Sequence, residues 1–217
     1  MDYTLRTIEH LDWITYVLVG TFGVLALTRW LYPRRFYEFM MLPITDKYFA
    51  LQGKGYEIKH PFNVALFGIQ VVSFSLFIYL ILLQREPEIP TKQPWLYIQL
   101  LTGVSIFLFG KYVIEKMIAN IFNMEAVVNS YLYEKLSYAS LISLLALVFN
   151  ILFFYAIPPN PLILWVFAGT ILVLFVISLI SSFKRNANLI LRYFFYFILY
   201  LCALEIAPFI VLYKLLD

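Results

Sequence analysis

The sequence predicts an all-α, polytopic membrane protein with six transmembrane helices, and two observations lead to this fold class. First, 63% of its 217 residues are hydrophobic and only 13% are charged, with a mean hydropathy of +0.83, whereas soluble domains are about 45–50% apolar and about 25% charged. Second, the chain contains six apolar stretches of the ~20 residues that a helix needs to cross a bilayer. Because lipid offers the backbone no hydrogen-bond partner, stretches of this length are expected to be helical.

The apolar stretches give the order of the elements within one predicted integral-membrane domain, residues 1–217. We predict spans at residues 11–32, 62–84, 95–116, 137–157, 162–183 and 190–213. The first span is expected to stay in the mature protein, because Asp2 and Glu9 precede it. A cleaved signal peptide would begin with a basic segment instead.

Two of the connections carry structural signals. The segment 36–41, within the loop 33–61, is rich in aromatic residues and methionine, which is typical of a short amphipathic helix in the membrane interface; an ordered loop packed on the bundle is the alternative. Between the fourth and fifth spans, the sequence IPPNP ends one helix and places Pro161 in the first turn of the next.

The third span does not stop at Lys116, because its pattern continues as MIANIFNMEAVVNSYLYEKL. We therefore predict a long helix that leaves the membrane near Lys116 and ends around Asn123. A separate interfacial helix containing Tyr131 and Tyr133 is then expected to lead into the fourth span.

Basic residues predict the orientation. The connections after spans one, three and five, together with the span ends nearest to them, hold twelve of the 16 Lys and Arg residues: Arg29, Arg34, Arg35, Lys47, Lys54, Lys59, Lys111, Lys116, Lys135, Lys184, Arg185 and Arg192. The opposite side holds Arg6, Arg85, Lys92 and Lys214. The positive-inside rule places the richer side in the cytoplasm, so both termini are expected to be extracytoplasmic.

Glu205 is the clearest candidate for a functional residue, because an ionisable side chain at membrane depth is costly. It lies 15 residues beyond Ile190, which is ~22 Å along a helix, and Pro208 follows it at a predicted kink. The carboxyl group could carry a proton or bind a substrate. Alternatively, it is a neutral acid that forms hydrogen bonds between helices.

Three further polar residues are candidates. Asn150 lies ~20 Å from the predicted inner boundary of its span, close to the depth of Glu205. Lys111 and Glu115 are four residues apart and can pair on one helix face. With Arg29, Lys116 and Arg192 they form a basic group near the boundary, which either snorkels to the interface or binds an anionic lipid or a phosphate.

The sequence lacks the motifs of several common classes of enzyme and cofactor-binding protein. Common hydrolase, metalloprotease, phosphate-binding and dinucleotide-binding motifs are absent. His10 and His60 lie outside the spans, where they could not hold a membrane haem, and Cys202 is the single cysteine. We therefore predict no catalytic residue, metal or cofactor. The sorting of basic residues by connection indicates topology and not nucleic-acid binding.

The C-terminal segment resembles a known family. The string LYLCALEIAP, which contains Glu205 and Pro208, and the region FGKYVIEKMIANIFNMEAVVNSYLYEKLSY are similar to the family called domain of unknown function 4271. The resemblance covers most of residues 60–217. It implies a small multi-pass inner-membrane protein of the Bacteroidota and brings no established activity.

Three functions remain open. The first is a structural or accessory subunit of a larger inner-membrane complex, whose partners are membrane lipids and other membrane protein subunits. The second is a transporter of a small solute, protons or lipid that uses Glu205 and Asn150. The third, an intramembrane enzyme, would need polar groups that converge at the lipid boundary. The first is favoured.

Overall fold

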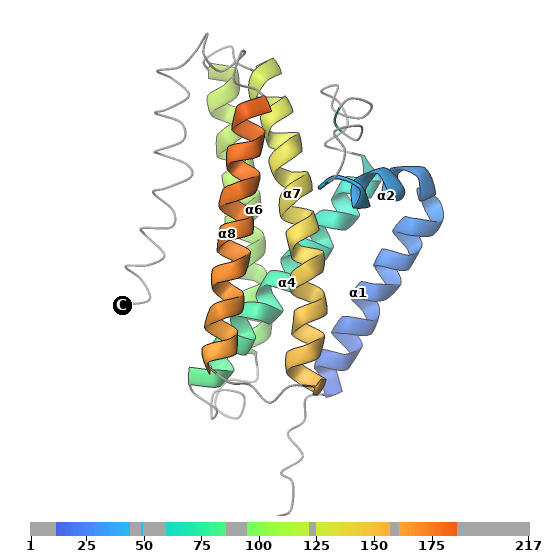
Figure 1. Ribbon diagram of the computed structural model, residues 1–217, viewed down its shortest axis with the longest axis vertical. Coiled ribbons are helices and arrows are strands. Elements are labelled where there is room, and N and C mark those ends of the chain that lie inside the picture. The colour runs from blue at the N-terminus through green and yellow to red at the C-terminus, as the bar shows by residue number, and fades with distance from the viewer. Residues whose placement is uncertain are drawn as a thin grey trace, which may run out of the picture.

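The computed structural model describes residues 12–43, 49, 60–85, 95–121, 125–156 and 161–185. These residues form an all-helical bundle in which five helices are long and apolar enough to cross a membrane (Figure 1). The predicted sixth span, residues 190–213, lies outside the described residues.

The helices agree in place with the first five predicted spans. Their bounds are Asp12–Leu31 for α1, Pro33–Met40 for α2, Pro61–Arg85 for α4, Leu96–Ile121 for α6, Glu125–Ile151 for α7 and Pro161–Arg185 for α8. One π-helical turn, Leu152–Ala156, extends α7. The long helices run alternately up and down the bundle (Figure 1).

The interior of the bundle is built mainly from α4 and α7. In the most apolar window of each helix, 56% of the residues of α4 and 44% of those of α7 are buried, against 6% for α6. α4 crosses the bundle obliquely and packs against α1, α6 and α7 (Figure 1). α8 packs against α7.

Helix α7 differs from the prediction for this region. α6 ends at Ile121, close to the predicted end, but no separate interfacial helix follows. Tyr131 and Tyr133 lie within α7, which is continuous from Glu125 to Ile151, and both side chains are buried. The prediction was wrong because neighbouring helices enclose this segment, so its aromatic residues fill the interior and do not line an interface.

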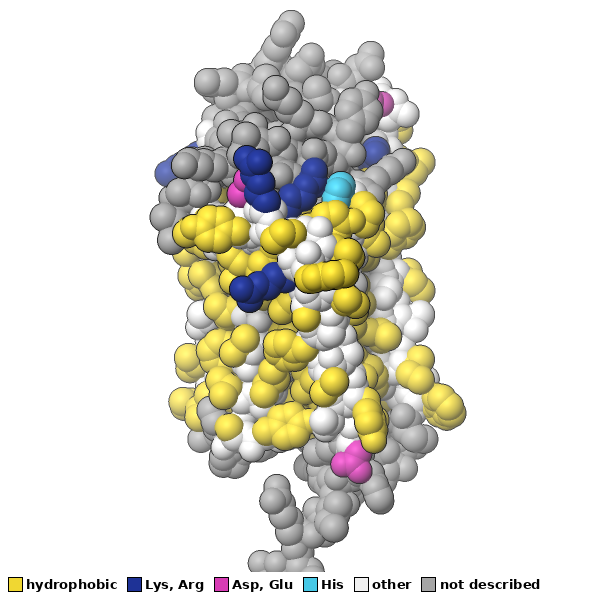
Figure 2. Space-filling model, turned by 90° about the vertical axis from the view of Figure 1, so that its right-hand side faces the viewer, with side chains coloured by type: hydrophobic (Ala, Val, Ile, Leu, Met, Phe, Trp, Pro, Cys, Tyr) yellow, Lys and Arg dark blue, Asp and Glu magenta, His cyan; other side chains and the backbone are white. Residues whose placement is uncertain are grey.

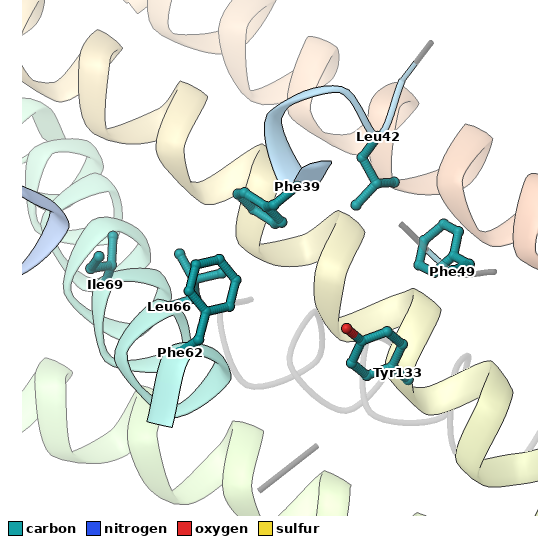
Figure 3. Close-up of a cluster of buried hydrophobic side chains, with 7 residues drawn as sticks. All are labelled: Phe39, Leu42, Phe49, Phe62, Leu66, Ile69 and Tyr133. Carbon is teal, nitrogen blue, oxygen red and sulfur yellow. The ribbon is translucent and has the colours of Figure 1, made fainter. Parts of the chain in front are cut away.

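The prediction of a short helix after the first span is confirmed, since α2 covers most of the aromatic and methionine-rich segment. α2 also packs on the bundle, because the Phe39 side chain is fully buried. Figure 3 shows this side chain within a cluster formed by Phe39, Leu42, Phe49, Phe62, Leu66, Ile69 and Tyr133. The two alternatives thus describe one element, which is both a helix and part of the packed bundle.

Prolines begin three of the helices. Pro33, Pro61 and Pro161 are the first residues of α2, α4 and α8, a position where the missing N–H group costs nothing. At α4, the backbone N–H of Phe62 also donates to Nδ1 of His60, at 3.2 Å. His60 therefore caps a helix that would otherwise begin with an unsatisfied donor.

Candidate functional site

A buried ion pair joins α6 to α7. Lys135 Nζ lies 2.5 Å from Glu115 Oε1, and the two residues are only 8% and 1% exposed. Both charges are largely removed from solvent by this burial, so their mutual attraction has to offset a large desolvation cost. Lys135 also lies 5.9 Å from the centre of the Tyr131 ring.

The residue before Lys135 joins α7 to α8. Ser182 Oγ donates a hydrogen bond of 2.8 Å to Oε2 of Glu134, and both residues are buried. All five residues from Tyr131 to Lys135 are buried. Since successive residues of a helix point in different directions, α7 is enclosed on every side here. We call residues 131–135, with Glu115 and Ser182, the enclosed cluster.

A second set of polar contacts joins α7 to α4 further along the bundle. Ser140 Oγ donates to Oε1 of Gln70 at 3.4 Å, and Asn150 Nδ2 donates to the backbone carbonyl of Ser73 at 2.9 Å. All four residues are buried. Hydrogen bonds of this kind hold helices together in membranes, each contributing about 0.6 kcal/mol on average.

The side-chain oxygen of Asn150 is a buried hydrogen-bond acceptor without a donor among the described residues. The Asn150 side chain is 0% exposed, and its Oδ1 has no hydrogen-bond partner in the part of the chain that the structure describes. The π-helical turn Leu152–Ala156 begins two residues later, and such turns occur often at functional positions. A buried acceptor with a free lone pair can take a hydrogen bond from a protonated group.

The predicted site residues that the structure describes do not form a single site. Glu115 and Asn150 are both buried, but one lies in the enclosed cluster and the other in the α4–α7 contact. Lys111 is half-buried, one turn before Glu115 on α6. Glu205 and Arg192 lie outside the described residues.

Sequence reasoning missed Lys135, Glu134 and Ser182. A signal for the first two was present, because Glu134 and Lys135 are adjacent charges in an aromatic stretch. The three residues 122–124 between α6 and α7 force the helices to be antiparallel neighbours, so Glu115 can reach that stretch. Reading the stretch as an interfacial helix concealed this partner.

The sequence matches the family described as domain of unknown function (DUF4271) over residues 14–216. The chain belongs to this family. The matched range covers all the contacts above, and it also covers Glu205 and the whole predicted sixth span. No curated protein and no solved structure gives a significant match, so the function of this DUF4271 chain has to be inferred from its own residues.

The enclosed ion pair leads to a prediction on stability. Replacing Glu115 by Gln removes the carboxylate that pairs with the buried charge of Lys135, and breaking a buried ion pair in this way costs about 3–5 kcal/mol. The double variant Glu115→Leu/Lys135→Met removes both charges, so its loss should be smaller than that of Glu115→Gln alone. Unfolding of the purified protein in mild detergent measures both effects.

Lys116→Met is the matched control, because Lys116 is exposed and adjacent to Glu115 in the sequence. It should change the free energy of unfolding by less than 1 kcal/mol, as exposed charges do. A double variant less stable than Glu115→Gln would contradict the assignment of this pair.

Proposed function

We propose that the protein is a structural or accessory subunit of a larger complex in the inner membrane, with six spans and both termini extracytoplasmic. It is an integral membrane protein that positions other subunits and lipids around a fixed bundle. The observation that carries the proposal is that the buried polar side chains form hydrogen bonds and an ion pair between helices.

Four polar contacts support a fixed bundle. Glu115–Lys135 joins α6 to α7, Glu134–Ser182 joins α7 to α8, and the contacts of Gln70 and Asn150 join α4 to α7. A conduit would require polar groups that face a water-filled path, whereas these groups face one another across helix interfaces. Their geometry therefore favours a scaffold over a carrier that changes shape.

The outer surface supports the presence of partners. In the same apolar windows, only 6% of the residues of α6, 17% of those of α8 and 22% of those of α1 are buried, so the other helices cover little of these three spans completely. On α6 the outward residues include Ile106 and Phe109, which are 68% and 60% exposed. Such faces are available to lipid and to the helices of other subunits.

Purification from native membranes in mild detergent tests the subunit proposal. We expect the tagged chain to elute well above its own 25.5 kDa mass, together with the same membrane proteins in a constant ratio. Ile106→Trp adds bulk to the least buried span without entering the bundle, so it should reduce partner recovery several-fold. Val173→Trp makes the same kind of change on the exposed face of α8, so comparing the two variants shows which of these faces the partners bind.

Elution of the chain alone, at the size of a single copy, would refute the subunit proposal. The Ile106→Trp variant tests a different point, which is whether α6 is the face that binds the partners. If partner recovery is high in both tryptophan variants, partners exist but do not bind α6.

The charge distribution supports the proposed orientation. The alternating helices bring Arg29, Arg34, Lys116, Lys135 and Lys184 to one end of the bundle, whereas Asp12 and Arg85 lie at the other. Figure 2 shows most of the visible Lys and Arg side chains near the upper edge of a broad hydrophobic band, with one of them lower, within the band. The positive-inside rule assigns that end to the cytoplasm.

Reporter fusions test this orientation. A reporter joined after Asp217 should be active only as an extracytoplasmic protein, and one inserted within residues 45–58 only as a cytoplasmic protein. The reverse pattern would refute the orientation, since it would require twelve basic residues to cross the membrane.

Transport of a proton or small solute is the second candidate, and it is favoured by the buried Oδ1 of Asn150, which accepts no hydrogen bond from any residue that the structure describes. A protonated Glu205 in the proposed sixth span, at a similar depth, would be a suitable donor to this atom. Such a pair could load and release a proton, or it could be a static hydrogen bond.

Substitution of Glu205 separates the two roles. Gln keeps the shape and hydrogen-bonding capacity of a neutral Glu, so a structural role predicts near-normal complex recovery for Glu205→Gln and a modest loss for Glu205→Ala. Proton cycling predicts that Glu205→Gln is as inactive as Glu205→Ala although it is well folded. Growth of a strain that depends on the protein, at matched expression, measures the difference.

A further inference from the structure

The turn between α1 and α2 is held rigidly on the bundle. Backbone hydrogen bonds cross it, from Tyr32 N to Thr28 O at 3.0 Å and from Phe36 N to Tyr32 O at 2.9 Å. The Tyr32 ring packs edge-on against His60, with ring centroids 4.9 Å apart. With Phe39 buried in the cluster of Figure 3, this turn has a fixed shape. We call residues 29–40 the α1–α2 corner.

The outward side of the corner combines cations with large apolar side chains. Arg29 is exposed at the end of α1, and the Arg34 side chain is 83% exposed on α2. In the same segment, Trp30 and Tyr37 are 77% and 63% exposed, and Met40 is half exposed. Figure 2 views the side of the bundle on which α1 and α2 lie and shows Lys and Arg side chains bordering hydrophobic ones.

Two arginines of the corner, Arg29 and Arg34, gain little charge neutralisation from other described residues. The corner contains three arginines and one acid, Glu38. Arg34 pairs with Glu38 at 3.3 Å, in an exposed pair that contributes little. Arg29 forms no ion pair with any residue that the structure describes. Arginine binds phosphate oxygens through two parallel N–H groups, and tryptophan and tyrosine prefer the headgroup level of a bilayer.

We propose that the α1–α2 corner is a binding site for the headgroup of an anionic phospholipid in the adjacent leaflet. Arg29 and Arg34 contact the phosphate, while Trp30, Tyr37 and Met40 pack against the glycerol and the upper acyl chains. The buried Phe39 holds α2 in place before the lipid binds. Binding therefore costs no conformational entropy for ordering this helix. This site does not depend on the subunit role proposed above.

Lipid titration of the purified full-length chain tests the site. Phosphatidylglycerol and phosphatidylcholine are added separately to the protein in neutral detergent, and native mass spectrometry counts the bound lipid. We expect phosphatidylglycerol to bind more tightly. Each arginine near a charged surface contributes about fivefold, so Arg29→Gln/Arg34→Gln should weaken its binding about 25-fold. Phosphatidylcholine binding should stay unchanged.

A charge-matched variant is the control. Arg85→Gln/Lys184→Gln also removes two exposed positive charges, but at the ends of α4 and α8, and should retain tight phosphatidylglycerol binding. The proposal is overturned if this variant loses binding equally, since the effect is then one of net charge. Equal binding of the two lipids, or displacement of phosphatidylglycerol by millimolar inorganic phosphate, also overturns it.

Discussion

The enclosure of α7 between residues 131 and 135 is the constraint on which the arrangement of the other helices depends. Two ionisable side chains, Glu134 and Lys135, are buried there next to each other. A buried charge without a partner is among the most costly features that a protein can contain. α6 must therefore bring Glu115 to Lys135, and α8 must bring Ser182 to Glu134. The positions of two helices are specified by adjacent residues on a third.

The contact between α4 and α7 specifies the arrangement in a different way. It consists mainly of apolar packing, with neutral hydrogen bonds at Gln70 and Asn150. Such bonds are individually weak, so the packing of apolar side chains over a large area is what stabilises this contact. The bundle thus combines a charged, highly specific end with a broad apolar interior, a division suited to a scaffold whose helices keep a fixed register.

Much of the fold could be predicted from the sequence, because it follows from local properties. Apolar runs of bilayer length predicted all five long helices, although α7 begins at Glu125 and not at residue 137, and Pro161 began α8 as expected. The site depends on which helix faces which, and that information is not local. Glu115 was recognised as unusual, but its partner Lys135 is 20 residues away. The aromatic residues around Lys135 resemble those of an interfacial helix until their neighbours are known.

The burial of Phe39 has a consequence for the order in which the chain is assembled in the membrane. The cavity that receives this side chain is completed by Phe62 of α4 and Tyr133 of α7, the latter roughly 90 residues later in the chain. At ~5–20 residues per second, translation takes roughly 5–20 s to reach it. During that interval the side chain of Phe39 lacks the two aromatic neighbours that cover it in the complete bundle. Docking of Phe39 would then mark the completion of the first four spans.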